Sequence, residues 1–113
     1  MIETNVSVSL IEPRHLEKAA LLIELRGRLD IRCTSKLLSA LTTETRAIAG
    51  YIIDLRAVRE VYDSGVALLV MANRLARKAA LPLQLVNCDP NLACRCRSLG
   101  LRVAHEFPVP GVV

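Results

Sequence analysis

The sequence has 113 residues, 52% apolar and only 3% aromatic, which is enough for one domain with an aliphatic core and too few for two. The net charge of +4 comes from fifteen basic and eleven acidic residues spread along the chain, and with almost no aromatic residues to stack on bases it indicates no nucleic-acid surface. No uncharged apolar run approaches the roughly 20 residues of a membrane span, and the N-terminus lacks the features of a signal peptide, so we expect a cytoplasmic protein without membrane insertion.

Five stretches have the apolar patterns of strands. The first alternates apolar and polar residues, as a half-exposed strand does, whereas the next three are mostly apolar, as buried strands are. The fifth is expected to be a last edge strand. A polar segment around Pro13 joins the first two strands as a hairpin, and residues 27–30 are predicted to form a turn. The predicted strands are residues 6–11, 19–25, 51–55, 82–86 and 103–107.

Three stretches have the spacing of helices with one apolar face. Thr34 is the expected N-cap of the first helix and Gly50 its expected end, while Gly100 is expected to end the third and residues 108–113 to form a loose tail. The predicted helices are residues 34–49, 64–80 and 91–99. Strands that alternate with helices run mainly parallel, so residues 1–113 are predicted to form a single α/β domain with a mixed, mainly parallel β-sheet covered by helices.

The cysteines and histidines do not predict a metal site or an active site. They are not at the spacing of zinc ligands, and Ser64 has neither a histidine nearby in the sequence nor a glycine-rich phosphate loop. We therefore expect no metal, no catalytic residue and no enzymatic activity. Cys94 and Cys96 alternate with two arginines, which suggests a lowered thiol pKa as a weaker redox hypothesis.

The stretch Tyr62-Asp63-Ser64-Gly65 stands where a buried strand and a short polar loop give way to a helix. The first N–H groups of a helix lack intrahelical partners and carry partial positive charge, which favours a hydroxyl, a carboxylate or a phosphate. Ser64 is therefore well placed for a switch, although an ordinary N-cap is the simpler interpretation.

Four short motifs, in this order and at these separations, resemble those of the STAS domain family, the anti-sigma factor antagonists and their relatives. They are Gly27-Arg28-Leu29-Asp30, Ile53-Asp54-Leu55, Tyr62-Asp63-Ser64-Gly65 and Ser98-Leu99-Gly100-Leu101. The resemblance covers nearly all of residues 20–101 and implies a STAS-like fold, although the family's last helix is not evident in this sequence.

The resemblance also implies a mechanism. In anti-sigma factor antagonists a serine in this loop is phosphorylated by an anti-sigma factor that is also a serine kinase. The unphosphorylated antagonist binds this partner, and the phosphorylated one dissociates from it. ATP and Mg would then bind to the partner, no cofactor to this chain, and a phosphatase acting on Ser64 is a further implied partner. Aligning the Asp-Ser pair makes Ser64 the acceptor but leaves the loop one residue short, whereas a gapless alignment puts Asp63 in the acceptor position.

The implied partner-binding residues include both polar and apolar side chains of the loop and of the neighbouring turn. For Asp30 the alternative is a turn residue that bonds its own backbone, and for Val66, Leu69 and Met71 the alternative to exposed anchors is the core. The full set is Asp30, Tyr62, Asp63, Ser64, Gly65 and Val66.

A second function within the same family is also open. Some STAS proteins brace the ATPase of a bacterial lipid-transport ABC complex, and residues 53–55 and 65–69 resemble segments of those subunits. A docking subunit needs no kinase cycle, which suits the irregular loop. The high apolar content is compatible with a homodimer.

Overall fold

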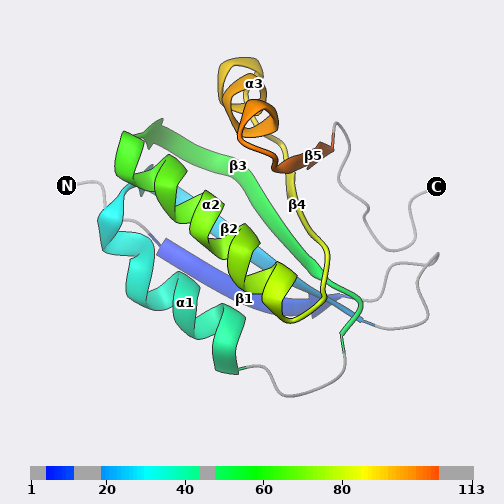
Figure 1. The fold of residues 1–113 in the computed structure, drawn as a ribbon. Coiled ribbons are helices and arrows are strands. Elements are labelled where there is room, and N and C mark those ends of the chain that lie inside the picture. Colours follow the sequence, from blue (N-terminus) through cyan, green and yellow to red (C-terminus); the bar gives the residue numbers. More distant parts are fainter. Residues whose placement is uncertain (1–4, 12–18, 44–47, 105–113) are drawn as a thin grey trace.

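The computed structural model describes residues 5–11, 19–43 and 48–104 and confirms the predicted α/β domain (Figure 1). Its five strands lie in the sheet in chain order. β1 and β2 form the predicted antiparallel hairpin, and all other neighbours are parallel. The strands are β1 (Asn5–Ile11), β2 (Ala20–Leu29), β3 (Tyr51–Val61), β4 (Leu83–Val86) and β5 (Arg102–Ala104). The helices are the short 3-10 helix η1 (Ile31–Cys33), α1 (Thr34–Thr43), α2 (Asp63–Lys78) and α3 (Pro90–Ser98).

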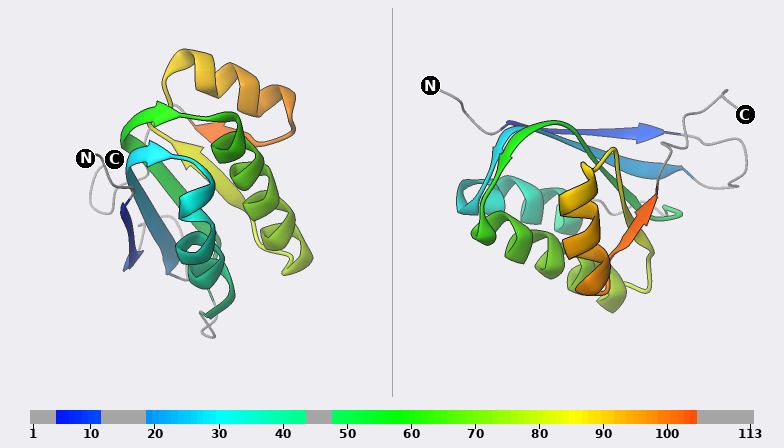
Figure 2. Two further views of the ribbon diagram at one scale, coloured as in Figure 1. Left: turned by 90° about the vertical axis from the view of Figure 1, so that its left-hand side faces the viewer. Right: turned by 90° about the horizontal axis from the view of Figure 1, so that it is seen from above.

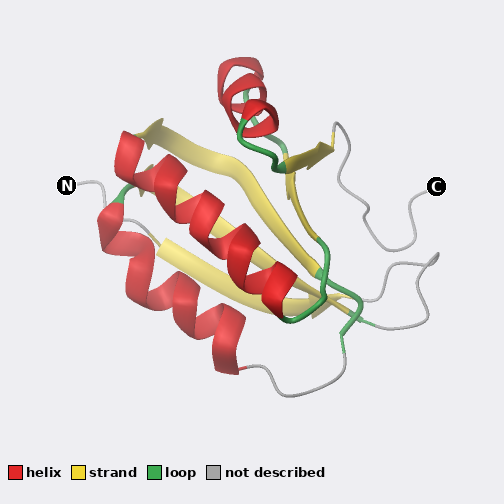
Figure 3. Ribbon diagram, in the orientation of Figure 1, coloured by secondary structure: helices red, strands yellow, loops and turns green. Residues whose placement is uncertain are grey.

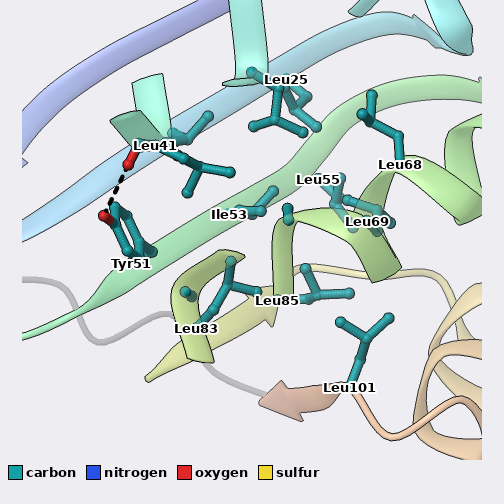
Figure 4. Packing of buried hydrophobic residues seen from close by; sticks show 14 of the residues in the cluster. Leu25, Leu41, Tyr51, Ile53, Leu55, Leu68, Leu69, Leu83, Leu85 and Leu101 are labelled. Atoms are coloured by element: carbon teal, nitrogen blue, oxygen red, sulfur yellow. Dashed lines mark hydrogen bonds between the residues drawn. The ribbon is translucent and has the colours of Figure 1, made fainter. Parts of the chain in front are cut away.

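Helices α1 and α2 lie side by side on one face of the sheet, and α3 lies beyond them near β4 and β5 (Figure 2). Alternate residues of the central strands point to this face, so their apolar side chains pack against the apolar sides of the helices. The fully buried Ile53, Leu69 and Leu85 lie in the core (Figure 4), and Ile23 of β2 is equally buried in the same cluster. At its margin the Tyr51 hydroxyl donates to the Leu41 carbonyl oxygen at 3.2 Å, which satisfies a buried polar group.

Two predicted polar connections are strand in the structure (Figure 3). The expected turn at residues 27–29 continues β2, and residues 56–61 continue β3 beside it. Gly27 has a φ of 81°, which glycine adopts without strain, at one of two places where the pairing of these strands shifts register. Both strands therefore reach further than their apolar runs, and β3 carries the chain to the start of α2 while β2 leads into η1.

Three predictions about helix ends have different outcomes. Thr34 was wrongly predicted as the N-cap of α1, because the helical turns begin at η1 and their cap is Asp30. Gly50 does not end a helix; a Cβ there would lie 2.7 Å from the Pro82 carbonyl oxygen, so the glycine allows β3 to begin close to the chain that enters β4. Gly100, with a φ of 87°, does end α3.

Other predictions fall outside the described residues. These are the tail at residues 108–113, the end of the predicted strand at 105–107 and the helical assignment of residues 44–47. Within the described residues, no helix is long and apolar enough to span a membrane.

Candidate functional site

The carboxyl ends of β2 and β3 meet the first turn of α2, and backbone contacts hold these three segments together. The Tyr62 N–H donates to the Leu29 carbonyl oxygen at 3.0 Å. A Cβ at Gly65 would lie 2.3 Å from the same oxygen, so only glycine allows this approach. Because this contact fixes the position of Gly65 against β2, it also fixes where residues 62–64 lie in space.

Ser64 is the second residue of α2 and does not cap its own helix. The N-cap is Tyr62, which forms no capping bond with its side chain. The Ser64 Oγ instead accepts a hydrogen bond from the Ile31 N–H at 3.1 Å and so joins α2 to the start of η1. The simple N-cap interpretation is therefore wrong, and the partly exposed hydroxyl is a link between two segments that are far apart in the sequence.

Asp30 is largely buried and caps η1, accepting from the Arg32 N–H at 2.9 Å. Its second carboxylate oxygen lies 2.8 Å from the Arg32 guanidinium. The side-chain hydrogen bond from Arg32 lowers the pKa of Asp30 below its ordinary value, although burial opposes this. The structure thus shows the backbone-bonding role that was the alternative for Asp30; its contact with a partner stays a prediction.

Tyr62 is 44% exposed, and its ring is held in place by two charged neighbours. Its hydroxyl donates to the Glu60 carboxylate at 2.8 Å, and the Arg28 guanidinium lies 5.7 Å from the ring centroid. The hydrogen bond to Glu60 is the main reason why the pKa of Tyr62 is raised. Because the ring is already ordered, little side-chain entropy is lost when a partner covers it, which suits a docking residue.

Asp63 has the most exposed side chain of this region and opens α2, where a carboxylate interacts favourably with the helix dipole. Arg95 from α3 forms an ion pair with it at 3.1 Å. A pair this exposed contributes little to stability. The negative charge of Asp63 is therefore presented to solvent and to any partner.

The structure adds one residue that the sequence predictions missed. Ile31 is 69% exposed, and its backbone is bonded to Ser64. The sequence feature that could have identified it is an apolar residue flanked by the charged Asp30 and Arg32. We call the exposed group of Ile31, Tyr62, Asp63 and Ser64 the corner surface.

Gly65 and Val66 lie beneath this surface. Val66 is only 4% exposed, so its side chain belongs to the core, as does that of Leu69. Met71 is partly buried against the same core. Of the predicted partner-binding residues, Gly65 and Val66 thus support the corner surface from below.

Of the two thiols in the redox hypothesis, Cys96 does not support it. Burial raises the pKa of Cys96 and raises that of Cys88 to about 12, so neither is a thiolate at neutral pH. Among the described residues, no group of three or more His, Cys, Asp or Glu side chains is placed to hold a metal ion. What the corner surface offers is an apolar side chain, an aromatic ring, a carboxylate and a hydroxyl, which is the chemistry of protein recognition.

The fold and the corner surface together define a domain of a helix-covered sheet with an exposed corner of mixed polarity at the start of α2. Residues 14–104 match the sequence model of the family described as "Mlab, STAS domain". The chain therefore belongs to the STAS domain family, as its motifs suggested. No curated protein matches the sequence.

Solved structures share the fold at low sequence identity. The anti-sigma factor antagonist SpoIIAA in its unphosphorylated form is 17% identical, with a TM-score of 0.70 over 91% of this chain and 90% of that one. A serine-to-glutamate variant of RsbS from Moorella thermoacetica is 22% identical, with a TM-score of 0.68 over 90% of this chain and 87% of that one. A sulfate transporter family protein of Wolinella succinogenes is 18% identical, with a TM-score of 0.64 over 74% and 75%.

Proposed function

We propose that this protein is an anti-sigma factor antagonist that binds an anti-sigma factor with serine kinase activity through the corner surface. Phosphorylation of Ser64 would release the partner, and a phosphatase would restore binding. In this scheme the protein acts in the cytoplasm and only binds its partner. ATP and Mg are bound by the kinase. The observation that carries the proposal is the position of the Ser64 hydroxyl, which lies beside exposed Ile31 at the start of a helix.

A phosphate on Ser64 would alter the surface more than the fold. It adds about two negative charges, which the N-terminal end of α2 can accommodate. A partner fitted to a neutral hydroxyl would have to bury that charge, and each 1.4 kcal/mol of lost interaction weakens binding about tenfold. The phosphoryl group would also crowd the Ile31 N–H that now donates to this oxygen, so the apolar side chain would move with it.

A second candidate function is that of a STAS subunit bracing the ATPase of a lipid-transport ABC complex. Two observations favour it. Asp63 places a fixed negative charge next to Ser64 on the exposed side of α2, which a partner without a kinase cycle could recognise directly. The matching family model is moreover described by the name Mlab. In this case the carboxylate of Asp63 matters and the state of Ser64 does not.

One set of variants separates the two functions. The tagged protein is used to capture partners from native extract, the captured proteins and the Ser64 peptide are analysed by mass spectrometry, and the affinity of each purified partner is then measured. We expect Ser64→Glu and Ile31→Ser each to weaken binding of the anti-sigma factor kinase by about tenfold or more, because the first adds charge and the second removes an apolar contact. Ser35→Glu is the matched control, because Ser35 is exposed and is likewise the second residue of a helix.

The outcomes are distinct. A kinase that binds the Ser64→Glu variant as well as the unaltered protein would contradict the phosphorylation switch. Capture of a permease and ATPase, with binding lost in Asp63→Asn and kept in Ser64→Glu, would favour the second candidate.

A further inference from the structure

Strand β3 extends well beyond its neighbour β4. β4 ends at Val86, which pairs with Asp54, whereas β3 continues to Val61 and pairs with β2 over this whole length. Among the described residues, no strand pairs with the other edge of β3 from Leu55 onward (Figure 1). The Arg56 N–H donates to the Asp54 carboxylate at 2.9 Å. Beyond it, this edge presents backbone N–H and C=O groups that a further strand could use.

Two irregularities shape this edge. Residues 54–61 of β3 run beside residues 24–29 of β2, so β3 accommodates two extra residues, one near Leu55 and Arg56 and one at Arg59. A bulge of this kind bends a strand and re-aims its side chains. Arg56 and Arg59 are both exposed.

The same edge borders an open pocket of about 690 Å³. One side is lined by five residues of β3, and the other by the segment that leads into α3. The lining residues are Leu55, Arg56, Val58, Arg59 and Val61 on the first side and Asn87, Cys88, Asp89, Asn91 and Leu92 on the second. Half-buried Val58 and Val61 contribute apolar surface, and Arg56 and Arg59 contribute cationic groups. We call this pocket and the adjoining edge of β3 the β3 groove.

The charge of the β3 groove is not neutralised within the described part of the chain. There, neither Arg56 nor Arg59 forms a salt bridge. Asp89, the acidic residue of the lining, is committed to capping α3, where its Oδ1 accepts from the N–H groups of Asn91 and Leu92 at 2.8 and 3.1 Å. The groove thus combines a free strand edge, apolar side chains and two available guanidinium groups.

We propose that the β3 groove binds an extended acidic segment of a partner protein, which adds as a strand to β3 and places carboxylates against Arg56 and Arg59. A strand edge supplies affinity through main-chain hydrogen bonds and side-chain pockets supply specificity. Guanidinium groups favour carboxylates because they donate two parallel hydrogen bonds. A small anion would use the arginines alone, whereas a peptide uses the edge, the valines and the arginines together.

This second docking surface is separate from the corner surface, and its occupancy does not require Ser64. A partner could hold both surfaces at once, in which case the linked contacts would raise the overall affinity. Failure of the Ser64 switch would leave this proposal intact, because the test below uses neither Ser64 nor the kinase.

The probe is a fluorescein-labelled peptide of four Glu-Val repeats, titrated into ¹⁵N-labelled protein. We expect amide shifts concentrated at residues 55–61 and binding that is weakened about tenfold in the double variant Arg56→Ala, Arg59→Ala. The matched control removes two exposed arginines from α2, Arg74→Ala with Arg77→Ala, and is expected to change affinity by less than about twofold.

Two further ligands decide what is recognised. A peptide of four Glu-Pro repeats has the same charge but lacks half of the N–H donors, so it should bind much more weakly than the Glu-Val peptide. Equal binding of both peptides would overturn strand addition, and equal shifts with inorganic phosphate would overturn the peptide in favour of a small anion. Absence of shifts at residues 55–61 would mean that the bulges and arginines only protect the edge from aggregation, and would also overturn the proposal.

Discussion

Replacing Gly65 by alanine sets two effects against each other. Alanine favours a helix over glycine by about 1 kcal/mol in a helix interior, so helix propensity alone predicts a more stable protein. The added Cβ, however, would lie 2.3 Å from the Leu29 carbonyl oxygen and 2.7 Å from its carbon, about 1 Å short of an ordinary contact of 3.4 Å. Both obstructing atoms are backbone, so no side-chain rotation relieves the clash.

The start of α2 must therefore withdraw from the end of β2. Overpacking of this kind costs about 1–3 kcal/mol. The shift also strains the bonds from the Tyr62 N–H to Leu29 and from the Ile31 N–H to Ser64, each worth about 1 kcal/mol. We expect Gly65→Ala to lower the free energy of unfolding by about 2–3 kcal/mol, which corresponds to a fall in Tm of roughly 10 °C for a domain of this size.

Urea and thermal unfolding followed by circular dichroism measure this difference. Ala67→Gly is the reciprocal control, because Ala67 is exposed on the same helix and its loss should cost only about 1 kcal/mol of helix propensity. A Gly65→Ala protein as stable as the unaltered one, or more stable, would refute the reasoning from contact distance.

Two further predictions concern titratable groups. Asp30→Asn keeps an oxygen for capping but loses the charge. The folded-state pKa of Asp30 is lowered, so its charge stabilises the folded protein at pH values above the unfolded pKa near 3.8. That stabilisation is lost as pH falls through the folded-state pKa. The stability difference between Asp30→Asn and the unaltered protein, measured by urea unfolding, should therefore be constant near neutral pH and shrink as pH falls below about 4, and a difference that does not shrink there would contradict the pairing with Arg32. Iodoacetamide at pH 8 should modify exposed Cys94 at least about a hundredfold faster than Cys88 or Cys96, as peptide mass spectrometry can measure, and comparable rates would contradict their raised pKa values.

The sequence allowed the sheet, the helices and the site loop to be predicted because apolar periodicity reports which residues are buried. It failed where polar residues are in strands. Residues 56–61 look like a loop by composition, yet they extend β3 because β2 offers backbone partners to Ala57, Val58, Glu60 and Val61. Register shifts of this kind come from contacts between strands and leave no local periodicity.

The candidate site was predicted only in part for the same reason. Asp63 and Ser64 were found because a helix start can be read locally, whereas the bond from the Ile31 N–H to Ser64 joins residues 33 positions apart. The ion pair between Arg95 and Asp63 likewise depends on where α3 packs. Val66 was assigned to the docking surface because its helical phase relative to the sheet was not known, and the structure places it in the core.

The strands of the described sheet lie in the order in which they are synthesised. A chain emerging from the ribosome can thus extend the sheet by one neighbour at a time, without waiting for a distant segment to insert between two earlier ones. Since local pairings form faster than distant ones, we expect assembly to begin at the β1–β2 hairpin and proceed toward β5. A nascent chain that ends after β3 and α2 would already hold every residue of the corner surface, so the proposed docking site would be present before translation is complete.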